Sequence, residues 1–234
     1  MRKLYVGNKN YSSWSMRPWV LMKQAGIAFD EVKVRFDSFD AGSQFKSTIG
    51  ALSPVAKVPV LVDGDLVEWD TLAIAEYLAE TCPEKKLWPA AALDRARARS
   101  ICAEMHAGFG GLRHHCGMNI EASLPRIGAL LMRDQPSVRS DLARIVRMWT
   151  GLLDAHDGPG AAGESGFLFG EFSIADAYFA PVGTRIKTYA LPVPPAVTAY
   201  IERVQALPGV KAWIDGALAE KDFLPFEDPY RLER

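Results

Sequence analysis

The chain has 234 residues, of which 49% are hydrophobic and 24% charged, a composition typical of a folded protein with one large or two small domains. Its 27 basic and 28 acidic side chains leave a net charge of −1, so a general nucleic-acid-binding role, which needs a basic face, is not expected. The longest uncharged stretch, residues 188–201, contains prolines and is too short to span a bilayer, so no membrane association is expected.

The cysteines favour a reducing compartment. Cys82, Cys102 and Cys116 are odd in number and widely spaced, which argues against a disulfide framework. The first residues show no apolar signal-peptide core. The sequence therefore predicts a cytoplasmic protein.

Short strand-like and helix-like runs alternate in the first part of the chain. An Asp-Gly pair between two apolar runs is a strong hairpin signal, and Ser15 is a plausible N-cap for the first helix. The order β-α-β followed by β-β-α predicts a small α/β unit with a mixed sheet. Strands are expected at Leu4–Gly7, Phe29–Val34, Val58–Val62 and Leu66–Trp69, and helices at Ser15–Ala25 and Thr71–Glu80.

The second part of the chain shows no convincing strand pattern. Residues 83–92 carry two prolines and several charges, which is typical of a linker. Helices are expected at Leu93–Phe109, Pro136–His156, Ile174–Tyr189 and Pro195–Leu207. The chain therefore divides into an α/β domain over residues 1–82, a linker over residues 83–92 and an all-α domain over residues 93–234.

A serine-rich segment follows the first expected strand and opens the first helix, with the sequence Asn10-Tyr-Ser-Ser-Trp-Ser-Met-Arg-Pro18. The hydroxyls of Ser12 and Ser13 would lie beside the free N–H groups and the positive end of the helix dipole. Such a place stabilises an anion, for example a thiolate. The alternative is a capping cluster without chemistry, because serine is a favoured capping residue.

Two further features could hold a peptide-like ligand. Pro59 opens a strand, and a cis Val58–Pro59 bond would leave the Val58 N–H and C=O free to pair with an extended ligand. Asp70 and Thr71 begin the next helix and could hold the ammonium and carboxylate of an α-amino acid. Taken singly, these features could equally be a rigid turn and a helix cap.

No metal site is expected, because the histidines and the cysteine between His106 and Cys116 match no zinc-binding spacing. Dithiol redox chemistry is not supported, because the chain has no Cys-x-x-Cys.

Together the motifs resemble those of the cytosolic glutathione transferases, a family with bacterial members, and the zeta class matches best. Val58-Pro59 and Asp70-Thr-Leu-Ala-Ile74 resemble the Val-Pro and Glu-Ser-x-Ala-Ile of the family. Ser12-Ser-Trp-Ser-Met-Arg17 resembles the zeta-class motif Ser-Ser-Cys-Ser-x-Arg. In the second part, Ser173 and Asp176 resemble the Ser-x-x-Asp capping box at a helix start of the family's α-domain.

The resemblance implies a thioredoxin-like N-terminal domain with a mixed four-stranded sheet, an all-helical C-terminal domain and a homodimer. Ser12 or Ser13 would hydrogen-bond the thiolate of glutathione, the co-substrate; Ser12 is favoured, and Ser15 is not excluded by the spacing. The other glutathione contacts would be Gln44, Lys57, Val58, Pro59, Asp70 and Thr71. The electrophile would lie between the domains, with Trp14, Met105, His106, Phe109, Arg113 and Met118 as candidate contacts.

The expected function is therefore that of a glutathione transferase with a role in detoxification, which activates the glutathione thiol for attack on a small electrophile. Two alternatives remain open: a zeta-like glutathione-dependent isomerase, and a non-catalytic glutathione-binding or protein-interaction module on the same fold. Trp14 stands where zeta proteins have a cysteine, which weakens the case for isomerisation. A glutathione-dependent reductase ranks lower, because residues 8–18 contain no cysteine.

Overall fold

A mixed four-stranded sheet organises the first part of the molecule. The computed structural model describes residues 1–157 and 166–234. The strand order is β2-β1-β3-β4, in which β1 pairs in parallel with β2 and antiparallel with β3, and β3 is antiparallel to β4. The strands are β1 (Lys3–Val6), β2 (Asp30–Lys33), β3 (Val60–Asp63) and β4 (Leu66–Trp69). The sequence predicted all four strands, and the β3–β4 turn is the two-residue Gly64-Asp65.

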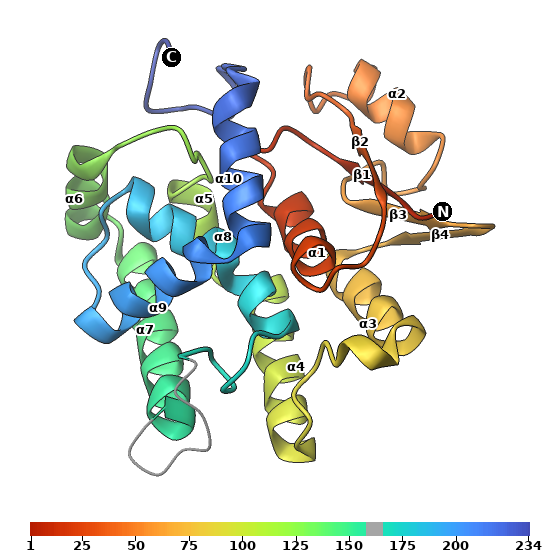
Figure 1. Cartoon of the computed structure of the whole chain (residues 1–234). Helices are drawn as coiled ribbons and strands as arrows, with labels where there is room; N and C mark the ends of the chain where they lie inside the picture. Colours follow the sequence, from red (N-terminus) through yellow and green to blue (C-terminus); the bar gives the residue numbers. More distant parts are fainter. Residues whose placement is uncertain (158–165) are drawn as a thin grey trace.

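Three helices cover this sheet: α1 (Ser13–Gln24), α2 (Gln44–Gly50) and α3 (Thr71–Thr81). Figure 1 shows α2 on the opposite side of the sheet from α1 and α3. The inner face of the sheet buries Leu4, Val6 and Leu61 in the same core as the apolar residues of α1 and α3. The sequence analysis did not predict α2, which is a single short segment with only two buried side chains.

The prediction that Ser15 caps the first helix is wrong. The N-cap is Ser12, and α1 begins at Ser13, so Pro18 lies inside the helix instead of in its first turn. Ser15 is fully buried, and its hydroxyl accepts hydrogen bonds from the Gly7 N–H (3.1 Å) and the Ser12 hydroxyl (2.8 Å). Ser15 therefore lies three residues beyond the true cap and faces inward, although serine is also a favoured capping residue.

Helices dominate the second part of the chain. Four of them match predicted helices, whereas η1, α5, α6 and α10 were not predicted. Two isolated bridges, Phe167 with Gly170 and Phe169 with Glu171, add a small extended element that the all-α prediction did not include. The helices are η1 (Pro83–Lys85), α4 (Ala92–Ala107), α5 (Gly110–His115), α6 (Pro125–Asp134), α7 (Pro136–Asp157), α8 (Ile174–Thr188), α9 (Pro195–Ala206) and α10 (Pro208–Glu220).

Helix α8 lies at the centre of the molecule and joins its two parts. Almost all of its side chains are buried, and it packs against α1, α4 and α9 (Figure 1). It begins with the predicted capping box, in which the Ser173 hydroxyl accepts from the Ala175 N–H and the Asp176 carboxylate accepts from the Ser173 N–H. The residues of α8 that face α1 are therefore held rigidly beside the start of α1.

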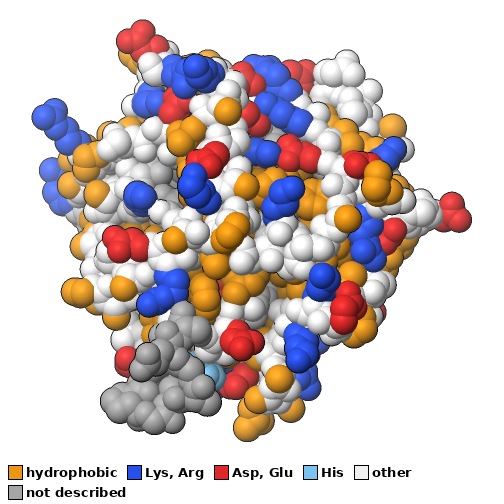
Figure 2. All heavy atoms as spheres, in the orientation of Figure 1, with side chains coloured by type: hydrophobic (Ala, Val, Ile, Leu, Met, Phe, Trp, Pro, Cys, Tyr) orange, Lys and Arg blue, Asp and Glu red, His pale blue; other side chains and the backbone are white. Residues whose placement is uncertain are grey.

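The face drawn in Figure 2 carries acidic and basic side chains interspersed with apolar ones. Within the described ranges, no helix has the length and apolar character needed to cross a membrane. The same residues contain no cluster of three or more histidine, cysteine, aspartate or glutamate side chains arranged to hold a metal ion. The three cysteines are buried free thiols.

Candidate functional site

Two adjoining cavities lie where the sheet meets α4, α5 and the C-terminal segment. The first, here the proline cavity, has a volume of about 410 Å³, and the second, the serine cavity, about 470 Å³. Their common walls are Trp14, Lys57, Val58 and Arg113. The proline cavity adds Pro59, Asp70, Thr71 and His106, and the serine cavity adds Ser12, Ser13, Met118, Arg185 and Glu227.

The floor of the proline cavity is a backbone edge. The Val58–Pro59 peptide bond is cis, and Val58 precedes β3 without joining the described strand pairs. Val58 is half-buried and borders both cavities. Its backbone N–H and C=O are thus placed to pair with an extended ligand.

At the far end of the proline cavity, Asp70 adopts a conformation that is rare for a residue with a side chain, with φ 78° and ψ 147°. As the N-cap of α3, its carboxylate accepts from the Leu72 N–H (3.2 Å). Strained backbone of this kind persists where the surroundings fix it, and it concentrates at ligand sites. Asp70 therefore presents a half-exposed carboxylate beside the first turn of α3.

A hydrogen-bonded network ties this end of the cavity to α8. The buried Thr71 hydroxyl lies 2.8 Å from the Tyr178 hydroxyl, which lies 3.3 Å from His106 Nδ1. The same histidine nitrogen is 3.3 Å from the Asp70 carboxylate. Burial raises the pKa of Tyr178 to about 12, so its hydroxyl remains protonated and can donate to a neighbour. Side chains from α3, α4 and α8 thus form one polar wall.

The two predicted serines have different partners in the serine cavity. The Ser12 hydroxyl donates to Ser15 Oγ at 2.8 Å. The Ser13 oxygen instead accepts a hydrogen bond from Arg185 Nη2 at 3.0 Å, and its own proton has no acceptor among the described residues. Within the same ranges no side chain caps this end of α1. The Ser13 hydroxyl and the first-turn N–H groups are therefore available to an anion.

Three guanidinium groups surround Ser13. Arg17 is buried and donates to the Ser13 carbonyl (2.8 Å). Its guanidinium carbon lies over the Trp14 ring, 4.2 Å from the ring centroid. Arg185 is also buried, and its Nε has no hydrogen-bond partner in the described part of the chain. Burial lowers the pKa of Arg17 to about 9 and of Arg185 to about 10, and the charge of Arg113 lowers both further. Arg17 and Arg185 stay cationic at neutral pH, and buried cations of this kind favour an anionic ligand.

Of the remaining residues predicted for the site, some line the two cavities and others lie outside them. Lys57, His106, Arg113 and Met118 line the cavities. Gln44 lies outside both linings; it is exposed, and its side chain donates to Thr48 (3.3 Å). Met105 belongs to the hydrophobic core, because α4 packs against α8, and Phe109, the N-cap residue of α5, is buried in the same core.

The sequence analysis did not predict the charged or polar residues that α8 and the C-terminal segment bring to the site: Tyr178, which contacts Thr71 and His106 beside the proline cavity, and Arg185 and Glu227, which line the serine cavity. Tyr178 and Arg185 come from α8, and Glu227 comes from the segment after α10. Nothing in the local sequence distinguished Arg185, because a second cation, Lys187, lies two residues further along α8. Glu227 had no signal either, because it lies in a short segment of apolar and acidic residues after the last helix, where no periodic pattern marks a buried side chain.

The architecture defines the class of protein. A thioredoxin-like unit with a mixed four-stranded sheet, followed by a bundle of helices, is the glutathione transferase fold, as the sequence predicted. The model of the glutathione S-transferase N-terminal domain matches residues 11–81, and that of the C-terminal domain matches residues 90–216. The chain therefore belongs to the glutathione S-transferase family.

Known proteins resemble the chain in sequence and in structure. A probable maleylacetoacetate isomerase of Caenorhabditis elegans is 31% identical over 47% of this chain and 49% of its own length, and the maleylacetoacetate isomerase of Rattus norvegicus is 32% identical over 47% and 50%. The chain thus matches about half the length of these relatives. A solved glutathione transferase homologue from Burkholderia with bound glutathione is 26% identical, with 93% and 98% of the two chains covered and a TM-score of 0.68.

Proposed function

We propose that the protein binds glutathione across the two cavities and activates its thiol as a thiolate for attack on a small electrophile. The tripeptide would pair with the Val58 backbone, and its γ-glutamyl end would meet Asp70 and Thr71. The similar Burkholderia protein, whose structure contains glutathione, supports this ligand. Lys57 would face the glycyl carboxylate.

The observation that carries the proposal is the hydrogen bond from Arg185 to Ser13 Oγ. Because the serine oxygen already accepts from a cation, its own proton is free to be donated to sulfur. We therefore assign the thiolate contact to Ser13, and a supporting role to Ser12, whose proton is engaged by Ser15.

The energies involved are sufficient. A free thiol has a pKa near ~8.5, and lowering it by two units requires about 2.7 kcal/mol. A hydrogen bond to a charged group contributes about 1.5–3 kcal/mol, and a helix N-terminus about 0.3–1 kcal/mol. The thiolate formed in this way attacks an electrophilic carbon; a leaving group then departs, or the adduct collapses again in an isomerisation.

The test is an ultraviolet difference titration of thiolate absorbance in the glutathione complex. We expect a bound thiol pKa about two units below that of free glutathione. Ser13→Ala should raise it by at least about one unit. Ser12→Ala is the matched control, since it removes the neighbouring hydroxyl and should change the pKa little. Saturation with glutathione without any thiolate would instead favour a non-catalytic binding module.

The second candidate is a glutathione-dependent isomerase, which the names of the relatives favour. Trp14 occupies the common wall of the two cavities and stacks against His106 (5.3 Å), where it narrows the space for a substrate. Turnover of maleylacetoacetate by the purified protein would support this candidate, and thiolate formation without turnover would remove it.

The homodimer and the cytoplasmic location remain predictions. Light scattering of the purified protein measures the first, and fractionation of its source cells the second.

A further inference from the structure

The C-terminal segment after α10 forms one wall of the serine cavity and brings a carboxylate into it. Glu227 is half-buried and lines the cavity together with Ser12, Ser13 and Arg185. It is the sole acidic side chain among the lining residues described for this cavity. A carboxylate that lines the same cavity as the thiol-activating serine can exchange protons with a ligand bound there.

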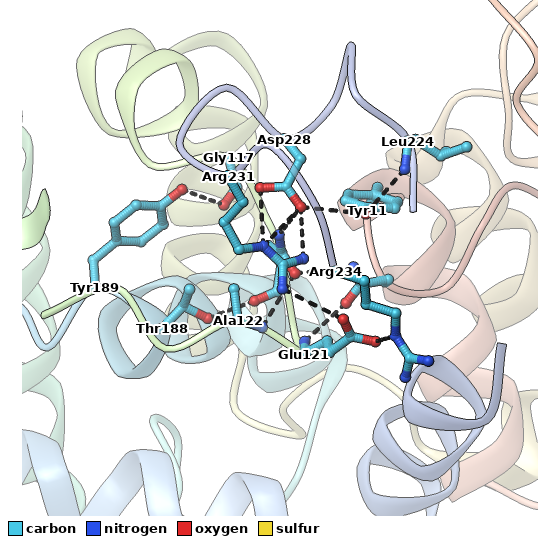
Figure 3. A network of polar contacts seen from close by, with 12 residues as sticks. Tyr11, Gly117, Glu121, Ala122, Thr188, Tyr189, Leu224, Asp228, Arg231 and Arg234 are labelled. Atoms are coloured by element: carbon cyan, nitrogen blue, oxygen red, sulfur yellow. Dashed lines mark hydrogen bonds and ion pairs between the residues drawn. The ribbon is translucent and has the colours of Figure 1, made fainter. Parts of the chain in front are cut away.

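The segment is held firmly against the serine loop, so the position of Glu227 is defined. Its neighbour Asp228 is buried and accepts from Arg231 (2.6 Å) and Asn119 (2.8 Å), and the Tyr11 hydroxyl approaches the same carboxylate at 3.5 Å (Figure 3). Tyr11 also accepts from the Leu224 N–H (3.3 Å). Because Tyr11 directly precedes Ser12, these contacts couple the place of Glu227 to that of the serines.

The Glu227 carboxylate is not used to hold the fold. It makes no hydrogen bond or ion pair with the described residues, although the charge of Arg185 reaches it. Burial raises the pKa of Glu227 to about 7 despite that cation. A group that titrates near neutral pH, with no structural partner, is suited to acid–base work.

We propose that Glu227 accepts the proton that the glutathione thiol loses on binding and returns it to the adduct, a role that rests on the function proposed above. The S–H bond breaks, the carboxylate gains an O–H bond, and the sulfur keeps the electron pair. When the thiolate adds to a conjugated double bond, the resulting carbanion takes this proton as the O–H bond breaks and a C–H bond forms. The carboxylate is thereby regenerated.

The charges around Glu227 favour this exchange. A thiolate formed at Ser13 is a like charge beside the carboxylate, and it raises the affinity of Glu227 for the proton in the same step. The ionisable groups that face Glu227 from the elements packed around the cavity are Tyr11 before α1, Lys46 on α2, Lys57 before β3, Arg113 on α5 and Arg185 on α8. On its own segment, Asp228 is engaged by Arg231.

The experiment counts protons. Glutathione is titrated into the protein by calorimetry at pH ~7.5 in buffers of different ionisation enthalpy, and the net proton release per bound ligand follows from linkage. We expect Glu227→Gln to release nearly one proton, because the thiol proton then passes to the buffer. The unaltered protein should release less than half as much, because Glu227 retains the proton. Glu227→Asp, which keeps a carboxylate, should lie between them.

Two controls isolate the effect. Glu233→Gln makes the same change at an exposed position of the same segment and should behave as the unaltered protein. S-Methylglutathione has no thiol proton and should abolish the difference between the variants. Equal proton release from Glu227→Gln and the unaltered protein, with thiolate absorbance present in both, would overturn this proposal alone. Absence of thiolate in both would instead overturn the proposed function.

Discussion

The two ends of α8 each bury a charged side chain, but the two charges are satisfied differently. At the first turn, Asp176 accepts from the Leu168 N–H (3.1 Å), the Tyr200 hydroxyl (3.1 Å) and the Ser173 N–H (2.9 Å). At the last turn, Arg185 donates to the Cys116 carbonyl and to Ser13, while its buried Nε has no partner in the described ranges.

This difference separates a structural charge from a functional one. Donors from the protein engage both oxygens of Asp176, and the site has no place for a ligand. Arg185 borders a cavity and has a donor that is not hydrogen-bonded to any described residue. An anion bound in the cavity would therefore offset the free-energy cost of burying this charge. We therefore expect changes at Asp176 to affect folding and changes at Arg185 to affect the bound thiol.

The largest expected effect is on stability. Asp176→Ala leaves four buried donors, two backbone N–H groups and two hydroxyls, without this acceptor and should lower the free energy of unfolding by about 3 kcal/mol. For a chain of this size the melting temperature should fall by roughly 6–12 °C. Thermal unfolding followed by circular dichroism measures it. Asp94→Ala, at the first turn of α4 and more exposed, should change stability by less than about 1 kcal/mol. Equal losses of unfolding free energy in Asp176→Ala and Asp94→Ala would contradict the structural role assigned to Asp176.

The pH dependence of the unfolding free energy tests the effect of burial on the Asp176 carboxylate. Burial raises the pKa of Asp176 to about 6, above its value of 3.8 in the unfolded chain. Because the folded state holds this proton more tightly, the contribution to stability is complete below pH ~4 and is lost as the pH rises through about 6. Asp176→Asn cannot titrate, so the difference in unfolding free energy between it and the unaltered protein should vary over this range. Urea unfolding at several pH values measures it, and a constant difference would contradict the burial effect.

At the other end of α8, Arg185→Met should act on the ligand. Loss of the guanidinium removes the donor to Ser13, and the bound thiol pKa should rise by about one unit, which lowers turnover about tenfold at pH ~6.5. Arg185→Lys keeps the charge and should recover part of the effect. Lys187→Met removes an exposed cation from the same turn and should leave the thiol pKa unchanged. If Arg185→Met and Lys187→Met shift the thiol pKa equally, the shift is due to the loss of a nearby positive charge and not to the loss of the hydrogen bond to Ser13.

Between the two ends, Tyr178 is expected to have a smaller effect. Tyr178→Phe removes the hydroxyl that bridges Thr71 and His106 but keeps the buried ring. We expect the Kd for glutathione to rise about fivefold, which corresponds to about 1 kcal/mol, with the thiol pKa unchanged. Tyr77→Phe, on α3, removes a hydrogen bond to Asp63 of β3 and is the matched control, with no expected change in Kd. An altered thiol pKa in Tyr178→Phe would show that the two ends are coupled.

Most of the first part of the fold was predictable from sequence, because its signals are local. The Asp-Gly turn, the Val58-Pro59 pair and the polar start of α3 each act through neighbouring backbone, and the structure brings the last two to one cavity. The N-cap position was not predictable, since Ser12, Ser13 and Ser15 are equally good cappers until the Gly7 N–H selects Ser15 as its partner. Helices α5 and α6 were not predicted, because a short helix contains few apolar repeats that would reveal its period.

The helical part of the site could not be predicted, because it depends on contacts between distant residues. The Arg185–Ser13 contact joins residues 172 positions apart in the chain, and the Tyr178–Thr71 contact joins residues 107 positions apart. No local pattern marks such a residue; only the packing of α8 on α1 brings it to the cavity. Glu227 depends in the same way on the contact between Asp228 and Tyr11.

The smallest expected effect concerns Gln44, which the family resemblance placed among the glutathione contacts. Its side chain is exposed, lies outside both cavities and donates a hydrogen bond to Thr48 one turn along α2. Gln44 is therefore neither a buried structural residue like Asp176 nor a cavity residue like Arg185. Gln44→Ala should change the Kd for glutathione by less than about twofold, because only a surface hydrogen bond is lost. Lys57→Ala, a change to a residue that borders both cavities, provides the comparison and should weaken binding more. Calorimetric titration measures both. A larger loss at Gln44 than at Lys57 would mean that α2 moves onto the ligand, and that the cavity described here closes when glutathione binds.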